Sequence, residues 1–163
     1  MVGNWTLITR GVQATEKAGQ RLGELFLPGD IICLVGELGA GKTCLTRGIA
    51  RGLRVKECVI SPSFVILNIY QGRLPLYHFD FYRLSSSEEI DYLDYGEFFF
   101  NQGVTVIEWA EKILPRLVQF LEIKIYFLGE KERKLEFLPR GKRYEDIATA
   151  FARKYPEIAK GAK

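Results

Sequence analysis

The stretch that decides the fold is residues 36–43, which read Gly36-Glu37-Leu38-Gly39-Ala40-Gly41-Lys42-Thr43. They fit the pattern G-x-x-x-x-G-K-[ST] at every fixed position. In such a loop the glycines leave room for backbone N–H groups to surround phosphate oxygens. Lys42 can reach the terminal phosphates, and the Thr43 hydroxyl can bind Mg²⁺. The stretch therefore predicts a phosphate-binding loop that opens a helix, whose positive end faces the same anions.

The residues on either side of this loop strengthen the prediction. Residues 31–35 form a short, continuous apolar run, which is typical of a buried parallel strand. After the loop, Leu45, Ile49 and Leu53 fall on one face of a helix. Gly52 is expected to end that helix. A strand, a glycine-rich loop and a helix in this order are the context in which the pattern binds phosphate.

Length and composition favour a single domain over residues 1–163. Of the 163 residues 47% are hydrophobic, and the mean hydropathy is −0.02, so the chain can build one sizeable core. No apolar run approaches the ~20 residues that a membrane span needs, so no membrane association is expected. The first residues lack the features of a signal peptide. The odd number of cysteines without metal spacing predicts buried, reduced thiols in a cytoplasmic protein.

The charge is small overall but unevenly distributed. The net charge of +3 is too small to argue for nucleic-acid binding by itself. Residues 130–163 carry ten Lys and Arg against six Asp and Glu, whereas seven acids and no base lie between Arg83 and Lys112. These segments are either solvated surfaces or separate docking surfaces for partners, and the pattern leaves both open.

The remaining periodicities predict an α/β fold. Strands are expected at 5–9, 31–35 and 104–108, hairpins at 64–70 with 74–79 and at 121–128 with 133–138, and helices at 13–26, after residue 42, after Ser86 and at 142–155. Ser86 and Glu89 form a capping-box pattern, and Gly96 could end the helix that follows. The predicted architecture is a P-loop NTPase-like three-layer sandwich: a mixed, mostly parallel central sheet with helices on both faces and β-hairpin extensions. The basic terminal helix at 142–155 belongs to the same domain.

Two acids at predicted strand ends could complete a hydrolytic site. Such a site needs an acid for Mg²⁺ or its waters and a polar group that orients the attacking water. Glu108 ends the strand at 104–108, and Asp80 ends the second strand of the first hairpin. The pattern does not decide which of the two holds the metal and which orients water.

Three neighbours of these acids have less certain roles. His78 is the only histidine and lies among aromatic residues, so a packed, hydrogen-bonded side chain is expected. Trp109 follows Glu108 and could fill the core or line the site. Arg83 could contact phosphate or pair with the acidic segment, and the ion pair is the favoured interpretation.

Several segments together resemble a known family. They are Gly36–Thr43, Ser61-Pro62-Ser63-Phe64, His78-Phe79-Asp80-Phe81-Tyr82-Arg83-Leu84, Tyr95-Gly96-Glu97-Phe98-Phe99 and Ile107-Glu108-Trp109-Ala110-Glu111. Their order and spacing resemble the TsaE (YjeE) family, the bacterial ATPase of tRNA threonylcarbamoyladenosine biosynthesis. The resemblance covers roughly residues 5–138. The segments at 78–84 and 107–109 are more specific than the loop, which many families share.

The resemblance implies a small cytoplasmic protein that binds ATP or ADP with Mg²⁺ and hydrolyses ATP slowly on its own. The resemblance also implies that the protein acts together with the TsaB–TsaD pair. That pair transfers a threonylcarbamoyl group to an adenosine next to the tRNA anticodon. The ATPase would support multiple turnover by that pair, and contact with tRNA would be indirect.

The resemblance also assigns roles by position. Lys42 would be the phosphate lysine, Thr43 and Glu108 the Mg²⁺ ligands, and Asp80 the catalytic acid or water positioner. The expected nucleotide-binding residues are Gly36, Glu37, Leu38, Gly39, Ala40, Gly41, Lys42, Thr43, Cys44, Thr15 and Trp109. Residues 61–64 would form a switch-like loop. The chain departs from the family pattern at Ser63, Cys44 and Ala110, where Thr, Thr and Pro are commoner.

Two other functions remain open on the sequence. A small-molecule kinase would use Asp80 as the base for a substrate hydroxyl, but it would need a basic lid, and only Lys112 and Arg116 lie in the candidate segment. A non-enzymatic nucleotide sensor would need only the loop and a switch segment.

Overall fold

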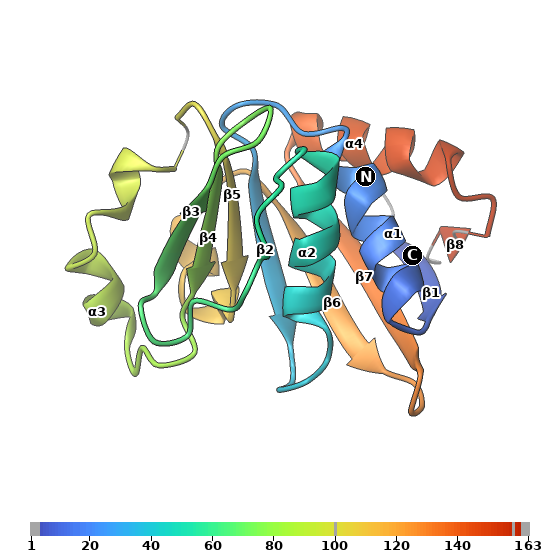
Figure 1. The fold of residues 1–163 in the computed structure, drawn as a ribbon, viewed down its shortest axis with the longest axis horizontal. Coiled ribbons are helices and arrows are strands. Elements are labelled where there is room, and N and C mark those ends of the chain that lie inside the picture. The colour runs from blue at the N-terminus through green and yellow to red at the C-terminus, as the bar shows by residue number, and fades with distance from the viewer. Residues whose placement is uncertain (1–3, 100, 158, 161–163) are drawn as a thin grey trace.

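The computed structural model describes residues 4–99, 101–157 and 159–160. Within them, eight strands form one sheet in the order β3-β4-β5-β2-β6-β7-β1-β8 (Figure 1). The strands are β1 Trp5–Arg10, β2 Ile31–Gly36, β3 Leu67–Tyr70, β4 Leu76–Asp80, β5 Val104–Glu108, β6 Phe120–Phe127, β7 Glu132–Arg140 and β8 Ala159–Lys160. The helices are α1 Val12–Gly23, α2 Lys42–Gly52, α3 Ser87–Asp91 and α4 Lys142–Arg153, with short 3₁₀ turns η1 Tyr95–Glu97, η2 Ala110–Lys112 and η3 Leu114–Arg116.

The centre of the sheet is parallel and its edges are antiparallel. Strands β4, β5, β2 and β6 pair in parallel, while β3 runs against β4, and β7 runs against both β6 and β1. This is the mixed sheet with hairpin extensions that the sequence predicts. The carboxyl ends of the parallel strands therefore meet at one edge, at the bottom of Figure 1, where the loop 36–43 joins β2 to α2.

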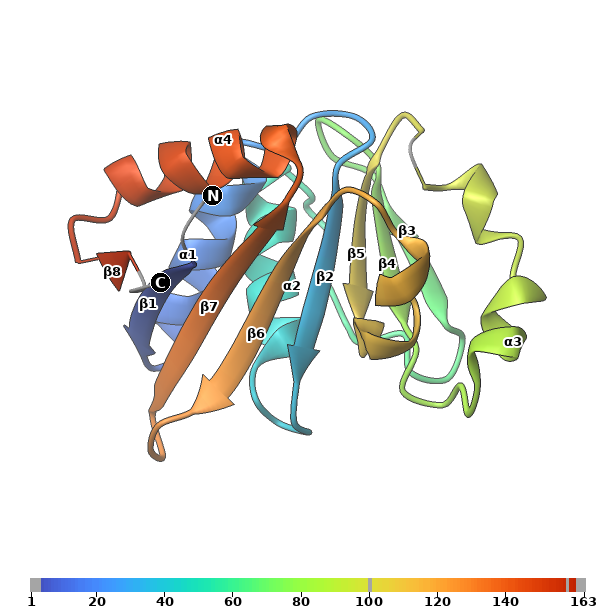
Figure 2. The same cartoon turned by 180° about the vertical axis from the view of Figure 1, so that it is seen from behind.

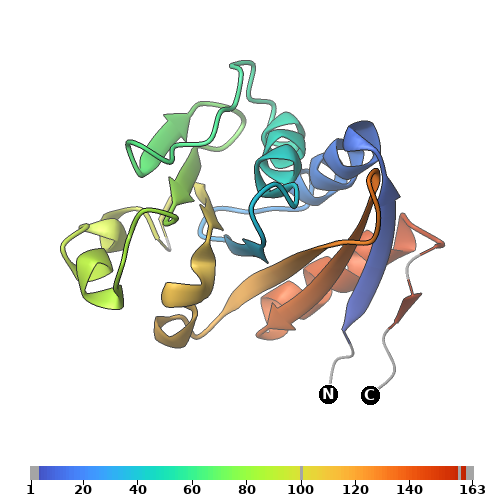
Figure 3. The same cartoon turned by 90° about the horizontal axis from the view of Figure 1, so that it is seen from below.

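Both faces of the central sheet are covered, as predicted. Ile32 and Leu34 share a core with buried side chains of α1, α2 and α4, whereas Ile31 and Cys33 pack with α3 and the residues of the 3₁₀ turns. Figure 3 shows α1 and α2 on one side of the sheet and α3 with the turns on the other. Burial on both sides explains why β2 is a continuous apolar run.

Helices α1 and α2 touch through glycines. A Cβ at Gly48 would lie 2.0 Å from the Glu16 carbonyl oxygen, and one at Gly52 would lie 2.2 Å from that of Gln20. Gly19 and Gly23 face the α2 backbone in the same way. Gly52 is the last residue of α2, as predicted, and it also takes part in this close packing.

Adding one methyl group at this contact should destabilise the fold. We expect Gly48→Ala to lower the free energy of unfolding by about 3 kcal/mol, because the new Cβ meets backbone that cannot move aside cheaply. Gly96→Ala is the matched control, since a Cβ there has nothing within 4 Å. Urea unfolding followed by circular dichroism measures both, and equal midpoints for the two variants would contradict the close-packing account.

The basic C-terminal helix is anchored to the rest of the chain by its charges. Helix α4 lies at the end of β7, beside α1 (Figure 2). Arg143 donates two hydrogen bonds to Asp30, at 3.1 and 2.7 Å, and the Tyr144 hydroxyl accepts one from the Ile31 amide at 2.8 Å. Burial raises the pKa of Tyr144 to about 12. Part of the positive charge in this segment therefore serves to dock α4.

Several local expectations were wrong. The helix predicted at 13–26 ends at Gly23, and the amides of Leu25 and Phe26 then bond to carbonyls only three residues back. Residues 64–66 form a turn before β3, where the Pro62 carbonyl accepts the Ile66 amide at 2.7 Å and Ile66 has a φ of +71°. Ser86 is the N-cap of α3, as predicted, but its side chain makes no cap hydrogen bond, and Glu89 accepts from the Ser85 amide and hydroxyl as well as from the Ser86 amide. Helix α3 ends at Asp91, well before Gly96. Helix α4 ends at Arg153 instead of residue 155, because Tyr155 precedes a proline and is disfavoured in a helix. Of the three free cysteines, Cys58 is exposed rather than buried.

In the described part of the chain, no helix combines the length and the apolar character that crossing a membrane requires.

Candidate active site

The loop 36–43 adopts the shape that its glycines allow. Gly39 and Gly41 have positive φ values of +78° and +115°, and Gly41 is the residue that caps the N-terminus of α2. Such φ values are strained for residues with a Cβ. The first amides of α2 have no partner within the helix, so the loop and the helix end offer a set of N–H donors to an anion.

Lys42 is folded back onto this loop. Its Nζ donates to the carbonyl oxygens of Gly36 at 2.5 Å and Glu37 at 2.9 Å, and lies 3.9 Å from the centroid of the Trp109 ring. Burial lowers the pKa of Lys42, while the charges of Glu108, Glu111 and Asp80 raise it. The ammonium group is therefore held at the mouth of the loop by weak partners that a phosphate could replace.

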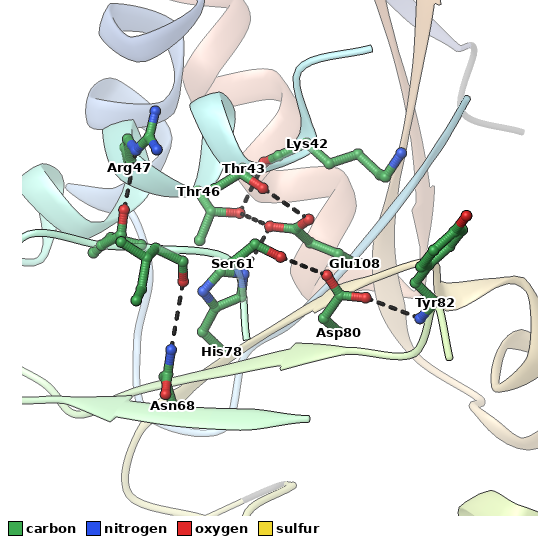
Figure 4. Close-up of polar contacts among 12 residues, drawn as sticks. Lys42, Thr43, Thr46, Arg47, Ser61, Asn68, His78, Asp80, Tyr82 and Glu108 are labelled. Atoms are coloured by element: carbon green, nitrogen blue, oxygen red, sulfur yellow. Dashed lines mark hydrogen bonds and ion pairs between the residues drawn. The ribbon is translucent and has the colours of Figure 1, made fainter. Parts of the chain in front are cut away.

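Glu108 lies directly against Thr43. The Thr43 hydroxyl donates to Glu108 Oε2 at 3.0 Å, and Glu108 Oε1 lies 2.7 Å from His78 Nε2 and 3.5 Å from Thr46 Oγ1 (Figure 4). A hydroxyl and a carboxylate oxygen side by side are the hard oxygen donors that Mg²⁺ prefers. Among the described residues, no three His, Cys, Asp or Glu side chains gather around a metal position.

Asp80 is the neighbour of Glu108 across the sheet, because the two residues are partners in the parallel β4–β5 register. Its Oδ2 accepts the Ser61 hydroxyl at 2.7 Å, and its Oδ1 accepts the Tyr82 amide at 2.9 Å. Both acids are almost completely buried. The two carboxylates therefore occupy different settings, one beside Thr43 and the other beside the loop that contains Ser61.

The predicted switch-like loop at 61–64 is attached at several points. Just before it, the Val59 carbonyl accepts Arg47 Nε at 3.0 Å, and the Ile60 carbonyl accepts Asn68 Nδ2 at 3.5 Å (Figure 4). Ser61 then bonds to Asp80, while Phe64 is largely exposed beneath the guanidinium of Arg83 at 3.9 Å. Arg83 thus stacks on Phe64 instead of making the ion pair that the sequence favoured.

Two cavities meet at the loop. One, of about 330 Å³, is lined by the loop together with Ser61, Asp80, Glu108 and Trp109. The other, of about 560 Å³, is lined by Thr15, Cys44, Arg10, Lys131 and Arg133. Gly39 and Gly41 line both. The two acids and Trp109 thus lie on one side of the loop, whereas Thr15 and Cys44 lie on the other.

Trp109 lines the site. Its ring stacks on Tyr82 with centroids 4.8 Å apart, and its φ of +56° is the left-handed conformation that residues with a Cβ rarely adopt. Such conformations cluster at functional sites. The sequence predicts that Trp109 either fills the core or lines the site, and its position agrees with lining the site.

Sequence reasoning missed Thr46 and Arg133. Thr46 follows Thr43 by three residues in α2, so helical spacing could have placed it on the same side. Arg133 lies in β7 and donates from Nε to the Ala40 carbonyl at 3.0 Å, holding the loop against the β6–β7 hairpin. No local pattern could have found a contact across 93 positions of the sequence.

Comparison with known proteins identifies the family. The family model described as "Threonylcarbamoyl adenosine biosynthesis protein TsaE" matches residues 9–135. The chain belongs to the TsaE family. This confirms the resemblance that the segments around the loop indicated.

Individual relatives of the TsaE family agree over most of the chain. A Treponema pallidum protein is 40% identical over 131 residues, which cover 78% of this chain and 96% of that protein. A Bacillus subtilis protein is 44% identical over 128 residues, covering 77% and 80%. Both are named tRNA threonylcarbamoyladenosine biosynthesis protein TsaE. The crystal structure of Bacillus subtilis YdiB matches with a TM-score of 0.83 and 36% identity, covering 94% of this chain and 97% of that one.

Proposed function

We propose that this protein binds ATP with Mg²⁺ and hydrolyses it slowly, and that this hydrolysis supports threonylcarbamoyladenosine modification of tRNA. The observation that carries the proposal is the adjacency of Thr43, Glu108 and Asp80 at the phosphate-binding loop. The relatives are named for the same pathway. We further propose that the protein acts in the cytoplasm with the TsaB–TsaD pair and reaches tRNA only through that pair.

The loop would bind the phosphates of ATP. Amides at the start of α2 would donate to phosphate oxygens, and Lys42 would leave the carbonyls of Gly36 and Glu37 to face the β- and γ-phosphates. The remaining residues of the loop would donate hydrogen bonds from their backbone N–H groups to the phosphates. Thr15 and Cys44 would face the nucleoside, because their cavity continues from the loop on the side away from the acids. Trp109 would cover the phosphates in the cavity that also contains the two acids.

Thr43 and Glu108 would hold Mg²⁺, and Asp80 would orient the attacking water. When bound, Mg²⁺ would neutralise charge that develops on the transferred phosphoryl group. Glu108 suits the metal because one of its oxygens already contacts the hydroxyl of Thr43. Asp80 faces the same cavity without contacting Thr43, so its carboxylate is placed to accept a hydrogen bond from water.

The kinase alternative has less support. Of the two basic residues between β5 and β6 that could serve a lid, Arg116 pairs with Asp91 of α3. That pairing holds the guanidinium at the α3 side of the protein and not over the phosphates.

One assay separates the three functions. The purified protein is incubated with ATP and Mg²⁺, with and without the TsaB–TsaD pair, and both ADP and free phosphate are measured. Phosphate release that rises with the pair supports the proposal. With a mixture of small-molecule alcohols added as phosphoryl acceptors, ADP formed without free phosphate would indicate a kinase. Binding without turnover in any of these conditions would indicate a sensor.

The proposed metal ligand makes a separate prediction. Glu108→Ala should remove most of the gain in ATP affinity that Mg²⁺ provides, a loss of about tenfold or more, and should leave affinity in EDTA nearly unchanged. Glu97→Ala, which removes an exposed acid, is the control. Calorimetric titration of ATP with Mg²⁺ or with EDTA measures both, and an unchanged Mg²⁺ dependence in Glu108→Ala would rule out this ligand.

A further inference from the structure

Among the described residues, the side chain of His78 makes one hydrogen bond, and that bond goes to Glu108. The ring is fully buried, with Nε2 at 2.7 Å from Glu108 Oε1. As a carboxylate, the form that binds a metal, Glu108 can only accept this bond, and Nε2 is then its donor. The other ring nitrogen, Nδ1, is buried and has no hydrogen-bond partner among the described residues.

This arrangement is poor for packing alone. The partner of His78 in the β4–β5 register is Val106, and the surrounding core is apolar. A buried polar atom without a partner destabilises a fold, and an apolar side chain of similar size would avoid that cost. The histidine is therefore better explained by the bond to Glu108 than by the core that encloses it.

The bond fixes which oxygen of Glu108 faces the loop. His78 and Thr46 both lie at Oε1, whereas Thr43 lies at Oε2 (Figure 4). Since Oε1 is occupied by the ring, a metal held by Thr43 would meet Oε2. Without the ring, the carboxylate could rotate about its terminal torsion, which has a broad energy profile.

We propose that His78 is a positioning residue that holds Oε1 of Glu108 and so directs Oε2 toward Thr43 and the metal. The inference rests on the proposed function, in which Thr43 and Glu108 bind Mg²⁺. The ring is packed and hydrogen-bonded, as the sequence predicts, and the inference gives that hydrogen bond a function. A ligating carboxylate is commonly oriented by such a hydrogen bond, and the partner tunes metal affinity.

Two substitutions test the role of the Nε2 donor. His78→Gln can present an N–H near the position of Nε2, whereas the shorter side chain in His78→Asn presents it near Nδ1. ATP binding is titrated by calorimetry with Mg²⁺ and with EDTA. We expect His78→Gln to keep the Mg²⁺-dependent gain in affinity and His78→Asn to lose about tenfold of it, with affinity in EDTA unchanged in both.

Two further variants distinguish a positioning role of His78 from a contribution to the stability of the fold. In a Glu108→Ala background, His78→Asn should cause no additional loss of Mg²⁺ dependence, because the two residues act through one bond. Phe79→Leu removes buried volume from the same strand toward the other face of the sheet, so it should lower stability without changing Mg²⁺ dependence.

The outcomes distinguish this inference from the proposed function. A wild-type chain whose ATP affinity does not rise with Mg²⁺ would overturn the metal site and the role of His78 with it. A wild-type gain that His78→Asn retains, or a loss that is equal in EDTA, would overturn the role of His78 alone.

Discussion

Replacing Lys42 with alanine is expected to weaken ATP binding by roughly 10- to 100-fold, the range for losing hydrogen bonds between charged groups. Lys42 is the cation at the mouth of the loop, and its present partners are two backbone carbonyls and the face of Trp109. Gly36 is half-buried and Glu37 is exposed, so water can replace Lys42 at their carbonyls and the fold should lose little stability.

The measurement for Lys42→Ala is calorimetric titration with ATP and Mg²⁺, together with a thermal unfolding curve. Lys17→Ala is the matched control, because it removes the same charge from the exposed face of α1. Wild-type affinity in Lys42→Ala would remove this residue from the phosphate site. A loss of affinity matched by a loss of folded protein would show a structural role instead.

Asp80→Asn is expected to abolish most ATP hydrolysis while leaving ATP binding within about threefold of the wild type. The carboxylate is proposed to orient or activate water, a role typically worth about 100-fold or more in rate. Asparagine keeps the size of the side chain and an oxygen that can accept the Ser61 hydroxyl or the Tyr82 amide.

Partner-stimulated phosphate release measures the effect of Asp80→Asn, and Asp94→Asn, an exposed acid of the 84–112 segment, is the control. Undiminished release by Asp80→Asn would refute the assignment. The contrast with Glu108→Ala is informative, because that variant should change the metal dependence of binding. If Asp80→Asn instead changed the Mg²⁺ dependence of ATP binding, and Glu108→Ala abolished only hydrolysis, Asp80 would be the metal ligand and Glu108 the residue that orients water.

The sequence predicted well what short segments encode. The loop 36–43, the strand before it and the helix after it are local, and the structure places them as expected. The segment 104–108 is a strand with the predicted bounds, because a continuous apolar run ends at an acid there. The boundaries that failed, at residues 24–26, 64–66 and 154–155, lie where a turn or a proline competes with the periodic pattern.

The contacts across the sheet could not be predicted in the same way. Asp80 and Glu108 each looked like the end of a strand, but only the parallel β4–β5 register makes them neighbours. The same register places His78 within reach of Glu108. Local reasoning predicted a packed, hydrogen-bonded histidine but could not name its partner. The Arg133 contact to the loop depends on β7 joining the sheet, and the family resemblance gave no sign of it.

The central claim is that ATP hydrolysis at this site supports repeated tRNA modification by the TsaB–TsaD pair. The most direct measurement is the amount of threonylcarbamoyladenosine formed per TsaD molecule in a reconstituted reaction with excess substrate tRNA, ATP and threonylcarbamoyl donor. With the wild-type protein we expect many modified tRNAs per TsaD, and with Asp80→Asn we expect about one. Equal, repeated modification with both proteins, or with neither protein added, would contradict the account.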